Sequence, residues 1–268
     1  MERIGAAFEA ARSDGRAALM PYMMGGFPDR EASAAIADAY VEAGADLVEL
    51  GVPFSDPLAD GPVIHAAATR ALAAGATLDS ALEIGARISS RLPVVAMVYA
   101  NMVLARGAAE TATLLAGAGL AGAIVPDLPP EEAGELRDAL HAVGLALVPL
   151  VAPTTPPERR RRICDGADGF VYVVSDTRTT GERDELPPEL AELVAAVRAD
   201  SPVPAAVGFG IGTPEQAASV GRIADGVIVG SRLVRAAGEA SDPAGAAAAV
   251  SEFIRAAREA MMTAGTAA

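Results

Sequence analysis

The stretch VELGVPFSDPLADGP, residues 48–62, joins the end of an apolar run to a loop of unusual composition. The residues before it, AGADLV at 43–48, form a turn signal followed by apolar residues, which predicts a short buried strand. Glu49 lies inside the apolar run, and Asp56 and Asp60 follow in a loop rich in proline. A carboxylate at a position where an aliphatic side chain would usually pack is a first indication of a functional residue.

The same pattern of helical stretch, short apolar segment and Gly-, Pro- or Asp-rich loop occurs eight times. The expected strands lie within 16–29, 45–51, 93–101, 121–127, 145–153, 168–176, 203–210 and 224–231. Near-continuous apolar strands separated by helices indicate a parallel sheet in an α/β protein. Eight units predict one (β/α)8 TIM barrel over 1–268, with an extra N-terminal helix and a frayed tail from about 260. A doubly wound sheet is the alternative, and eight regular units fit it less well.

The composition limits the class of protein. Of 268 residues, 51% are hydrophobic but only 4% aromatic, so Ala, Val, Leu and Ile must build the core of an ordered α/β protein. We expect a cytoplasmic protein, because no apolar run reaches about 20 residues and the N-terminus lacks a secretory pattern. A net charge of −14 argues against nucleic-acid binding, and the ERRRRIC cluster at 158–164 is typical of a solvated helix face.

Lysine, cysteine and histidine are absent or scarce, and this excludes some catalytic mechanisms and binding sites. The chain has no lysine, so it cannot form the lysine Schiff base of an aldolase or of a pyridoxal enzyme. Cys164 is the single cysteine and permits no internal disulfide, so we expect it to be buried in the core. His65 and His141 fall in separate helical segments, too few for a histidine metal site. We expect both to be structural or surface residues, and we expect no metal and no cofactor.

Glu49 is the first candidate for catalysis. Alternation along a strand places Leu47, Glu49 and Gly51 on one face and the intervening residues on the other. Active sites of such barrels form at the carboxyl ends of the strands, where Glu49 lies. An apolar setting raises the pKa of a carboxyl group, which suits a general acid/base near neutral pH. A surface glutamate at a strand end is the alternative.

Asp60, in the sequence ADGP, lies within reach of the same barrel mouth. Asp-Gly is also a strong turn signal, so the local sequence favours a catalytic residue and a turn residue equally. Asp56 precedes Pro57 and is more typical of a turn. Two carboxylates in different settings could divide the labour of proton transfer, one neutral through burial and the other ionised.

Two glycine-rich loops predict a phosphate site. GFGIGTPEQ at 208–216 and GSRLV at 230–234 follow the seventh and eighth expected strands. These two loops and a short extra helix are the usual phosphate site of a barrel, and a helix beginning at Ser231 would offer N–H donors. Capping by Ser231 and by Thr213-Pro214 is a compatible alternative. The residues indicate a barrel enzyme that acts on a small phosphorylated substrate by carboxylate chemistry.

The stretch VELGVPFSDPLADGPVI resembles the signature of the tryptophan synthase alpha subunit family. The resemblance covers almost the whole chain and its motifs fall in family order: PYMMGGFPD, VYANMVLARG, IVPDLPPEE, LVAPTTP, GFVYVVS, VGFGIGTPEQ and ADGVIVGS. It implies a lyase of tryptophan biosynthesis that cleaves indole-3-glycerol phosphate to indole and glyceraldehyde 3-phosphate by a retro-aldol step.

The resemblance also implies roles for individual residues. Glu49 becomes the acid/base, Asp60 the acceptor of the indole N–H, and Tyr172 a residue of the same site. Tyr22, Met97, Tyr99 and Leu150 match the indole pocket, and Gly181, Phe209, Gly210, Gly230 and Ser231 match the phosphate-binding positions. The family pairs with a pyridoxal-dependent beta subunit in an αββα complex. The loop of Pro53, Asp56 and Pro57 is then expected to contact that partner.

One segment departs from the family pattern. The family lid usually reads Ser-Arg/Thr-x-Gly-Val-Thr-Gly, whereas residues 175–189 read SDTRTTGERDELPPE, with Asp176, Arg178 and Thr179 at altered positions. Met24, where a threonine is common, is a smaller departure. Three hypotheses follow: an ordinary alpha subunit, a stand-alone lyase of a specialised pathway, or a non-catalytic activator of a beta subunit. Intact Glu49 and Asp60 count against the third.

Overall fold

The computed structural model describes residues 1–175, 189–208 and 210–265, with side chains described up to residue 263. The expected lid and two of the expected phosphate-site residues, Gly181 and Phe209, lie outside the described residues. In the described part, nine strands form one sheet: β1 Ala18–Met24, β2 Val48–Gly51, β3 Val94–Met97, β4 Gly122–Ile124, β5 Ala146–Val148, β6 Leu150–Val151, β7 Val171–Val174, β8 Ala205–Gly208 and β9 Gly226–Val229.

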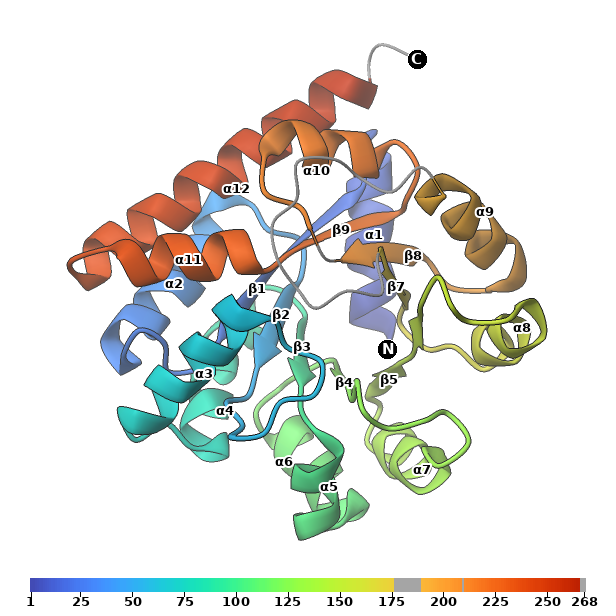
Figure 1. Ribbon diagram of the computed structural model, residues 1–268, viewed down its shortest axis with the longest axis horizontal. Helices are drawn as coiled ribbons and strands as arrows, with labels where there is room; N and C mark the ends of the chain where they lie inside the picture. Colours follow the sequence, from blue (N-terminus) through green and yellow to red (C-terminus); the bar gives the residue numbers. More distant parts are fainter. Residues whose placement is uncertain (176–188, 209, 266–268) are drawn as a thin grey trace.

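Helices surround this sheet (Figure 1). They are α1 Glu2–Ser13, α2 Arg30–Ala43, α3 Pro62–Ala73, α4 Leu78–Ser89, α5 Ala100–Arg106, α6 Ala108–Gly117, α7 Gly134–Ala142, α8 Pro157–Asp165, α9 Leu190–Asp200, α10 Pro214–Gly221, α11 Ser231–Glu239 and α12 Pro243–Gly265. The links between β2 and β3 and between β3 and β4 each carry two helices. No helix of the described residues is long and apolar enough to cross a membrane.

All strand pairs are parallel, in the order β5-β4-β3-β2-β1-β9-β8-β7-β6. The two strands at the ends of this order are pieces of one segment, 146–151, separated only by Pro149. Proline has no N–H to donate to a ladder, so the fifth expected strand divides there. Its first piece pairs with β4 and its second with β7, and this closes the expected TIM barrel.

The core has two layers, as alternation along the strands predicts. Leu47, Val95 and Phe170 belong to a cluster inside the barrel. Val48 and Leu50 belong to the larger cluster between the strands and the outer helices. Glu49 shares the inward face with Leu47 and is 2% exposed. The inner face therefore delivers this carboxylate to the barrel mouth.

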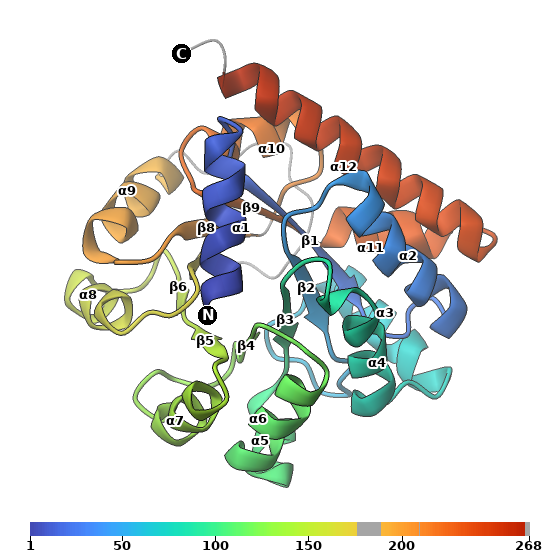
Figure 2. The same cartoon turned by 180° about the vertical axis from the view of Figure 1, so that it is seen from behind.

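Helix α1 closes the opposite end of the barrel, where the strands begin (Figure 2). Ile4, Phe8 and Ala11 are buried on one face of this helix. The ring of Phe8 packs against Phe170, with centroids 5.7 Å apart, and Phe170 packs in turn against Tyr172 at 6.5 Å. A continuous column of rings thus extends from the barrel floor to its mouth.

The helix ends follow the sequence signals. Asp29 caps α2 by accepting a hydrogen bond from the Ala32 N–H at 2.9 Å, and Gly44 ends it in the left-handed conformation with φ of 89°. Thr213 and Gln216 form a capping box at α10. Helix α12 packs along α2 and α10 (Figure 1) and continues to Gly265, beyond the point where the tail was expected to fray.

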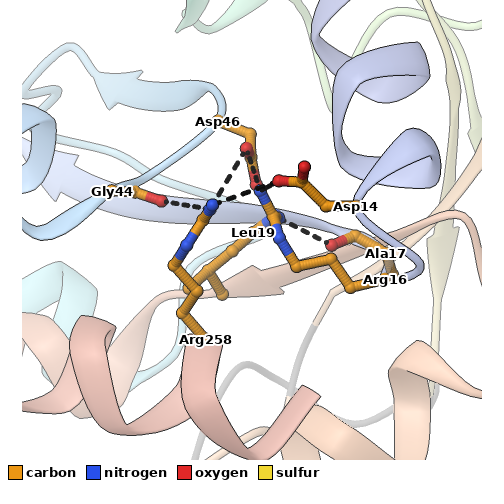
Figure 3. A network of polar contacts seen from close by, with 7 residues as sticks. All are labelled: Asp14, Arg16, Ala17, Leu19, Gly44, Asp46 and Arg258. Atoms are coloured by element: carbon orange, nitrogen blue, oxygen red, sulfur yellow. Dashed lines mark hydrogen bonds and ion pairs between the residues drawn. The ribbon is translucent and has the colours of Figure 1, made fainter. Parts of the chain in front are cut away.

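A charged network joins α1, β1, β2 and α12 at the barrel floor (Figure 3). Both carboxylate oxygens of Asp46 accept hydrogen bonds from Arg16, at 2.5 and 2.9 Å, and the Leu19 N–H donates to the same carboxylate at 2.8 Å. Arg258 reaches the pair from α12, 3.6 Å from Asp46. The Arg16 side chain is 2% exposed, so this is a buried ion pair with satisfied carboxylate oxygens.

Candidate active site

A cavity of about 590 Å³ opens at the carboxyl ends of the strands. Most of its walls are aliphatic, and its polar groups are few, as is usual for a small-molecule site. Its lining includes Tyr22, Glu49, Asp60, Met97, Asp127, Arg137, Leu150, Thr155, Tyr172, Gly210, Ile228, Gly230 and Ser231. Most of the residues expected from the sequence therefore meet in one space.

Glu49 is the most deeply buried acid of this cavity. Among the described residues its Oε1 atom has no hydrogen-bond partner. Burial raises the pKa of Glu49 to about 8, and the nearby charge of Asp60 acts in the same direction. The group is therefore protonated at neutral pH and can donate a proton.

Asp60 lies in the loop between β2 and α3 and faces the same cavity. Partial burial raises the pKa of its carboxyl group, while a hydrogen bond from Tyr99 and the charge of His65 lower it. These opposing effects separate the two acids, because Glu49 has no such partners among the described residues. The net effect of these surroundings is still to raise the pKa of Asp60, so the division into one neutral and one ionised carboxyl group stays a prediction.

Two tyrosines stand beside Glu49, and two glycines make room for them. Tyr22 is the neighbour of Glu49 in the β1–β2 register, and a Cβ built on Gly51 would lie 1.9 Å from the Tyr22 hydroxyl. A Cβ on Gly208 would lie 2.1 Å from the hydroxyl of Tyr172. Any side chain at Gly51 or Gly208 would therefore displace a ring of the site.

The glycine-rich end of the cavity is formed by Gly210, Gly230 and Ser231. Helix α11 begins at Ser231 as expected, but its N-cap is Gly230 and no side chain caps it. The expectation that Ser231 caps this helix is therefore wrong, because Ser231 is already helical. Ser231, the first residue of α11, lines the cavity, so the N-terminus of this helix borders it, which suits an anion.

Three of the four residues expected in the indole pocket line the cavity: Tyr22, Met97 and Leu150. Tyr99 is 3% exposed and is not among the lining residues of the described part of the chain. It lies behind the loop that carries Asp60, and the Ala59 N–H donates to its hydroxyl at 3.3 Å. The structure thus places Tyr99 one layer further from the cavity than the other three.

The loop expected to contact a partner has both buried and exposed parts. Pro53 is buried, Pro57 is half-buried and Asp56 is exposed. Leu58, next in the chain, has 81% of its surface exposed. An exposed leucine beside the cavity mouth is a feature that the sequence did not single out.

The sequence reasoning also missed polar residues of the cavity wall. Asp127 follows β4 and accepts a hydrogen bond from the Ala100 N–H at 2.8 Å. Arg137 lines the cavity from α7, and Thr155 from the loop after β6. Asp127 ends an expected strand, so its position carried a signal. Arg137 looks like any solvated helix residue in the sequence, so it carried none.

The remaining titratable residues lie away from the site or on the surface. Cys164 is buried in the outer core, as expected. His65 and His141 are exposed. Within the described residues, no group of three or more His, Cys, Asp or Glu side chains is arranged to hold a metal ion. The polar side chains that line the cavity in the described part of the chain carry carboxyl, hydroxyl and guanidinium groups.

Comparisons with known proteins identify the family to which the chain belongs. The family model described as tryptophan synthase alpha chain matches residues 8–263. The tryptophan synthase alpha chain of Carboxydothermus hydrogenoformans is 49% identical over 236 residues, covering 87% of this chain and 88% of the relative. That of Halorhodospira halophila is 46% identical over 258 residues, covering 95% of this chain and 93% of the relative.

Solved structures agree with the sequence relatives. A structure of Mycobacterium tuberculosis tryptophan synthase superposes with a TM-score of 0.89 at 38% identity, covering 97% of this chain and 98% of that chain. The tryptophan synthase subunit alpha of Legionella pneumophila superposes with a TM-score of 0.87 at 36% identity, with 97% and 98% covered. The chain therefore belongs to the tryptophan synthase alpha chain family.

Proposed function

We propose that Glu49 and Asp60 carry, in this chain, the lyase reaction of its family: the cleavage of indole-3-glycerol phosphate into indole and glyceraldehyde 3-phosphate. Indole is a poor carbanion leaving group, so its C3 atom must be protonated before the carbon–carbon bond breaks. Glu49, with a pKa of about 8, supplies that proton from its neutral carboxyl group.

The same residue then acts as a base. After donating its proton to C3, the Glu49 carboxylate takes the proton from the side-chain hydroxyl next to the scissile bond. The hydroxyl oxygen becomes the aldehyde oxygen, the carbon–carbon bond breaks, and its electron pair returns to the ring and neutralises the ring nitrogen. Glu49 ends the cycle protonated, so no external acid or base is consumed.

Asp60 stabilises the intermediate of this sequence. Protonation at C3 places positive charge on the ring nitrogen, and an ionised carboxylate that accepts the indole N–H offsets it. The hydrogen bond from Tyr99 and the charge of His65 favour the ionised form of Asp60. Tyr172 and Tyr22 wall the same space and exclude water from the reacting carbons.

The substrate spans the cavity from Glu49 to the start of α11. Its indole ring lies against the apolar walls that Tyr22, Met97 and Leu150 provide. Its phosphate lies at Gly210, Gly230 and Ser231, where the first N–H groups of α11 and the helix dipole favour an anion. Gly181 and Phe209 complete this phosphate site by family resemblance.

The single observation that carries the proposal is a buried Glu49 that borders the cavity and whose Oε1 has no partner among the described residues. Its test is indole release by the Glu49→Gln variant, which keeps the shape of the side chain and removes its acid. We expect a fall of about 10²- to 10⁴-fold in kcat with the fold retained. Indole release at the parent rate would exclude Glu49 from proton transfer.

We also propose that the loop of Pro53, Asp56 and Pro57 docks a tryptophan synthase beta subunit. Leu58, 81% exposed in this loop, and Leu104, 76% exposed on α5, are large apolar side chains that a partner could cover. Both follow strand ends, so they lie on the mouth side of the barrel.

The partner proposal is tested by sedimentation of the chain with a purified beta subunit and by indole release in the mixture. We expect an αββα complex that releases indole faster than the chain alone, and Leu58→Arg should weaken the complex. No complex, with fast release by the chain alone, would instead support the stand-alone lyase.

A further inference from the structure

Tyr99 contacts both halves of the loop that carries Asp60. Its hydroxyl accepts a hydrogen bond from the Ala59 N–H at 3.3 Å, and its interaction with the neighbouring Asp60 carboxylate lowers the pKa of that group. Its ring stacks on Phe54, with centroids 5.1 Å apart and planes 24° from parallel. Phe54 lies near the start of the loop, and Ala59 and Asp60 near its end, so a single side chain holds both.

Tyr99 is itself held firmly. It is the residue that precedes α5, and only Val98 separates it from β3. The next N–H in the chain, that of Ala100, donates to the Asp127 carboxylate at 2.8 Å. Contacts therefore join the loops that follow β2, β3 and β4, and the Asp60 loop is tied to a rigid neighbour rather than standing alone.

We propose that Tyr99 is a positioning residue that latches the Asp60 loop and holds the Asp60 carboxylate ready to accept the indole N–H. This inference rests on the role proposed above for Asp60. It differs from the wall of the indole pocket that the resemblance implies for Tyr99, because this side chain does not reach the cavity lining of the described residues.

The latch also affects the charge of Asp60. The titratable groups around this carboxyl group are Glu49 from β2, Tyr22 from β1, Tyr172 from β7, His65 from α3 and Tyr99 itself. Burial raises the pKa of Asp60, and the hydrogen bond from Tyr99 lowers it. Loss of the hydroxyl removes a lowering effect, so the pKa of Asp60 should rise and the ionised form should be lost at a higher pH.

The test is the Tyr99→Phe variant, which keeps the stacked ring and removes only the hydroxyl. We expect kcat for indole release to fall by about ten- to a hundredfold, with KM little changed, because the substrate still binds but its N–H acceptor is misplaced. The acidic limb of the kcat/KM profile should move to higher pH. Phe54→Leu, at a half-buried loop position, should lower kcat by about two- to tenfold without moving that limb.

Tyr40→Phe is the matched control. Tyr40 is a buried tyrosine of α2, and its hydroxyl donates to the main-chain oxygen of Tyr22 at 2.9 Å, in the outer layer of the core. The control variant also loses one buried hydroxyl and one hydrogen bond. It should lose stability without moving the acidic limb, which separates a general packing effect from the latch.

A double variant distinguishes a Tyr99 that positions Asp60 from a Tyr99 that forms a wall of the indole pocket. With Asp60→Asn already in place, Tyr99→Phe should cost no further activity if Tyr99 acts through Asp60. A raised KM, an unmoved acidic limb and an equal loss in the Asp60→Asn background would make Tyr99 a pocket wall and overturn the latch. Parent activity in Asp60→Asn alone would instead overturn the role of Asp60, and the latch with it.

Discussion

Two acids near the start of strand β2 lie in opposite settings. Asp46, just before the strand, accepts hydrogen bonds from Arg16 and from the Leu19 N–H, so both of its carboxylate oxygens have partners (Figure 3). Glu49, three positions later on the strand, is 2% exposed, and its Oε1 has no partner among the described residues. A satisfied charge therefore precedes the strand on the floor side, and an acid with an unpartnered oxygen lies within it and faces the mouth.

The acid at the floor contributes to stability, whereas the acid at the mouth is suited to catalysis. At the barrel floor, desolvation of Asp46 and Arg16 is offset by their pairing and by the hydrogen bond from Leu19. At the mouth nothing in the described residues offsets the desolvation of Glu49, so the group holds its proton until it reacts. Barrels place reacting groups at the carboxyl ends of their strands, and the cost of one unpaired acid stays confined to that end.

The largest stability effect should come from the floor. Asp46→Ala leaves the Arg16 guanidinium buried with its principal partner gone, and it removes the acceptor of the Leu19 N–H. We expect a loss of about 3–5 kcal/mol in the free energy of unfolding, with turnover of the folded fraction retained. Urea denaturation with indole release on the folded protein measures both.

Asp38→Ala provides the control for this loss. Asp38 also binds two arginines, Arg87 and Arg91, but on the surface, where both arginine side chains are at least 40% exposed. Its loss should cost no more than about 1 kcal/mol. Equal losses at Asp38 and Asp46 would mean that burial does not distinguish the floor network.

The acid at the mouth should make the stability of the fold depend on pH. Glu49 has a pKa of about 8 in the folded chain, against about 4.3 in an unfolded one, so the folded state binds the proton more tightly between these values. Stability should fall as pH rises through this window, by up to about 1.4 kcal/mol per pH unit from this group.

Comparison with Glu49→Gln isolates that effect, because the amide does not titrate. The difference in unfolding free energy between the variant and the parent chain should grow from pH 5 to pH 8, in favour of the variant. Chemical denaturation at a series of pH values measures it. A difference that stays constant with pH would show that Glu49 has an ordinary pKa.

Two strand glycines, one at the mouth and one at the floor, each lie against an aromatic ring. Gly208→Ala places a Cβ 2.1 Å from the Tyr172 hydroxyl at the mouth, and Gly226→Ala places one 2.8 Å from the Phe8 ring at the floor. The mouth variant should lose activity, and the floor variant should lose about 1–3 kcal/mol of stability. Thermal unfolding and indole release on both variants test this. If the mouth variant kept full activity, Tyr172 would not need its present position.

The sequence reveals the parts of this fold that local pattern determines. Apolar segments between helices gave the eight expected strands, and alternation placed Glu49 on the inward face. The division of the fifth expected strand at Pro149 follows from the missing N–H and was open to prediction. The position of α1 on the barrel floor could not be predicted in this way, because Phe8 contacts Phe170 only once the sheet has closed.

The candidate site shows the same limit. The sequence around Asp60 fits a turn residue equally well. Its interaction with Tyr99, which comes from a different loop, is seen only in the structure. The glycines that accommodate Tyr22 and Tyr172 are ordinary strand residues in the sequence. Contacts between loops far apart in the chain leave no local pattern, so the structure was needed to find them.

The protonation state of Glu49 at neutral pH decides whether this residue can supply the proton, and it can be measured directly. Infrared difference spectra between the parent chain and Glu49→Gln, recorded from pH 4 to pH 10, isolate the carbonyl stretch of this one carboxylic acid. With a pKa of about 8, the protonated band should persist at neutral pH and be lost with a midpoint of about 8. Loss of the band near pH 4.5 would contradict this expectation, because Glu49 would then be ionised when the reaction needs its proton.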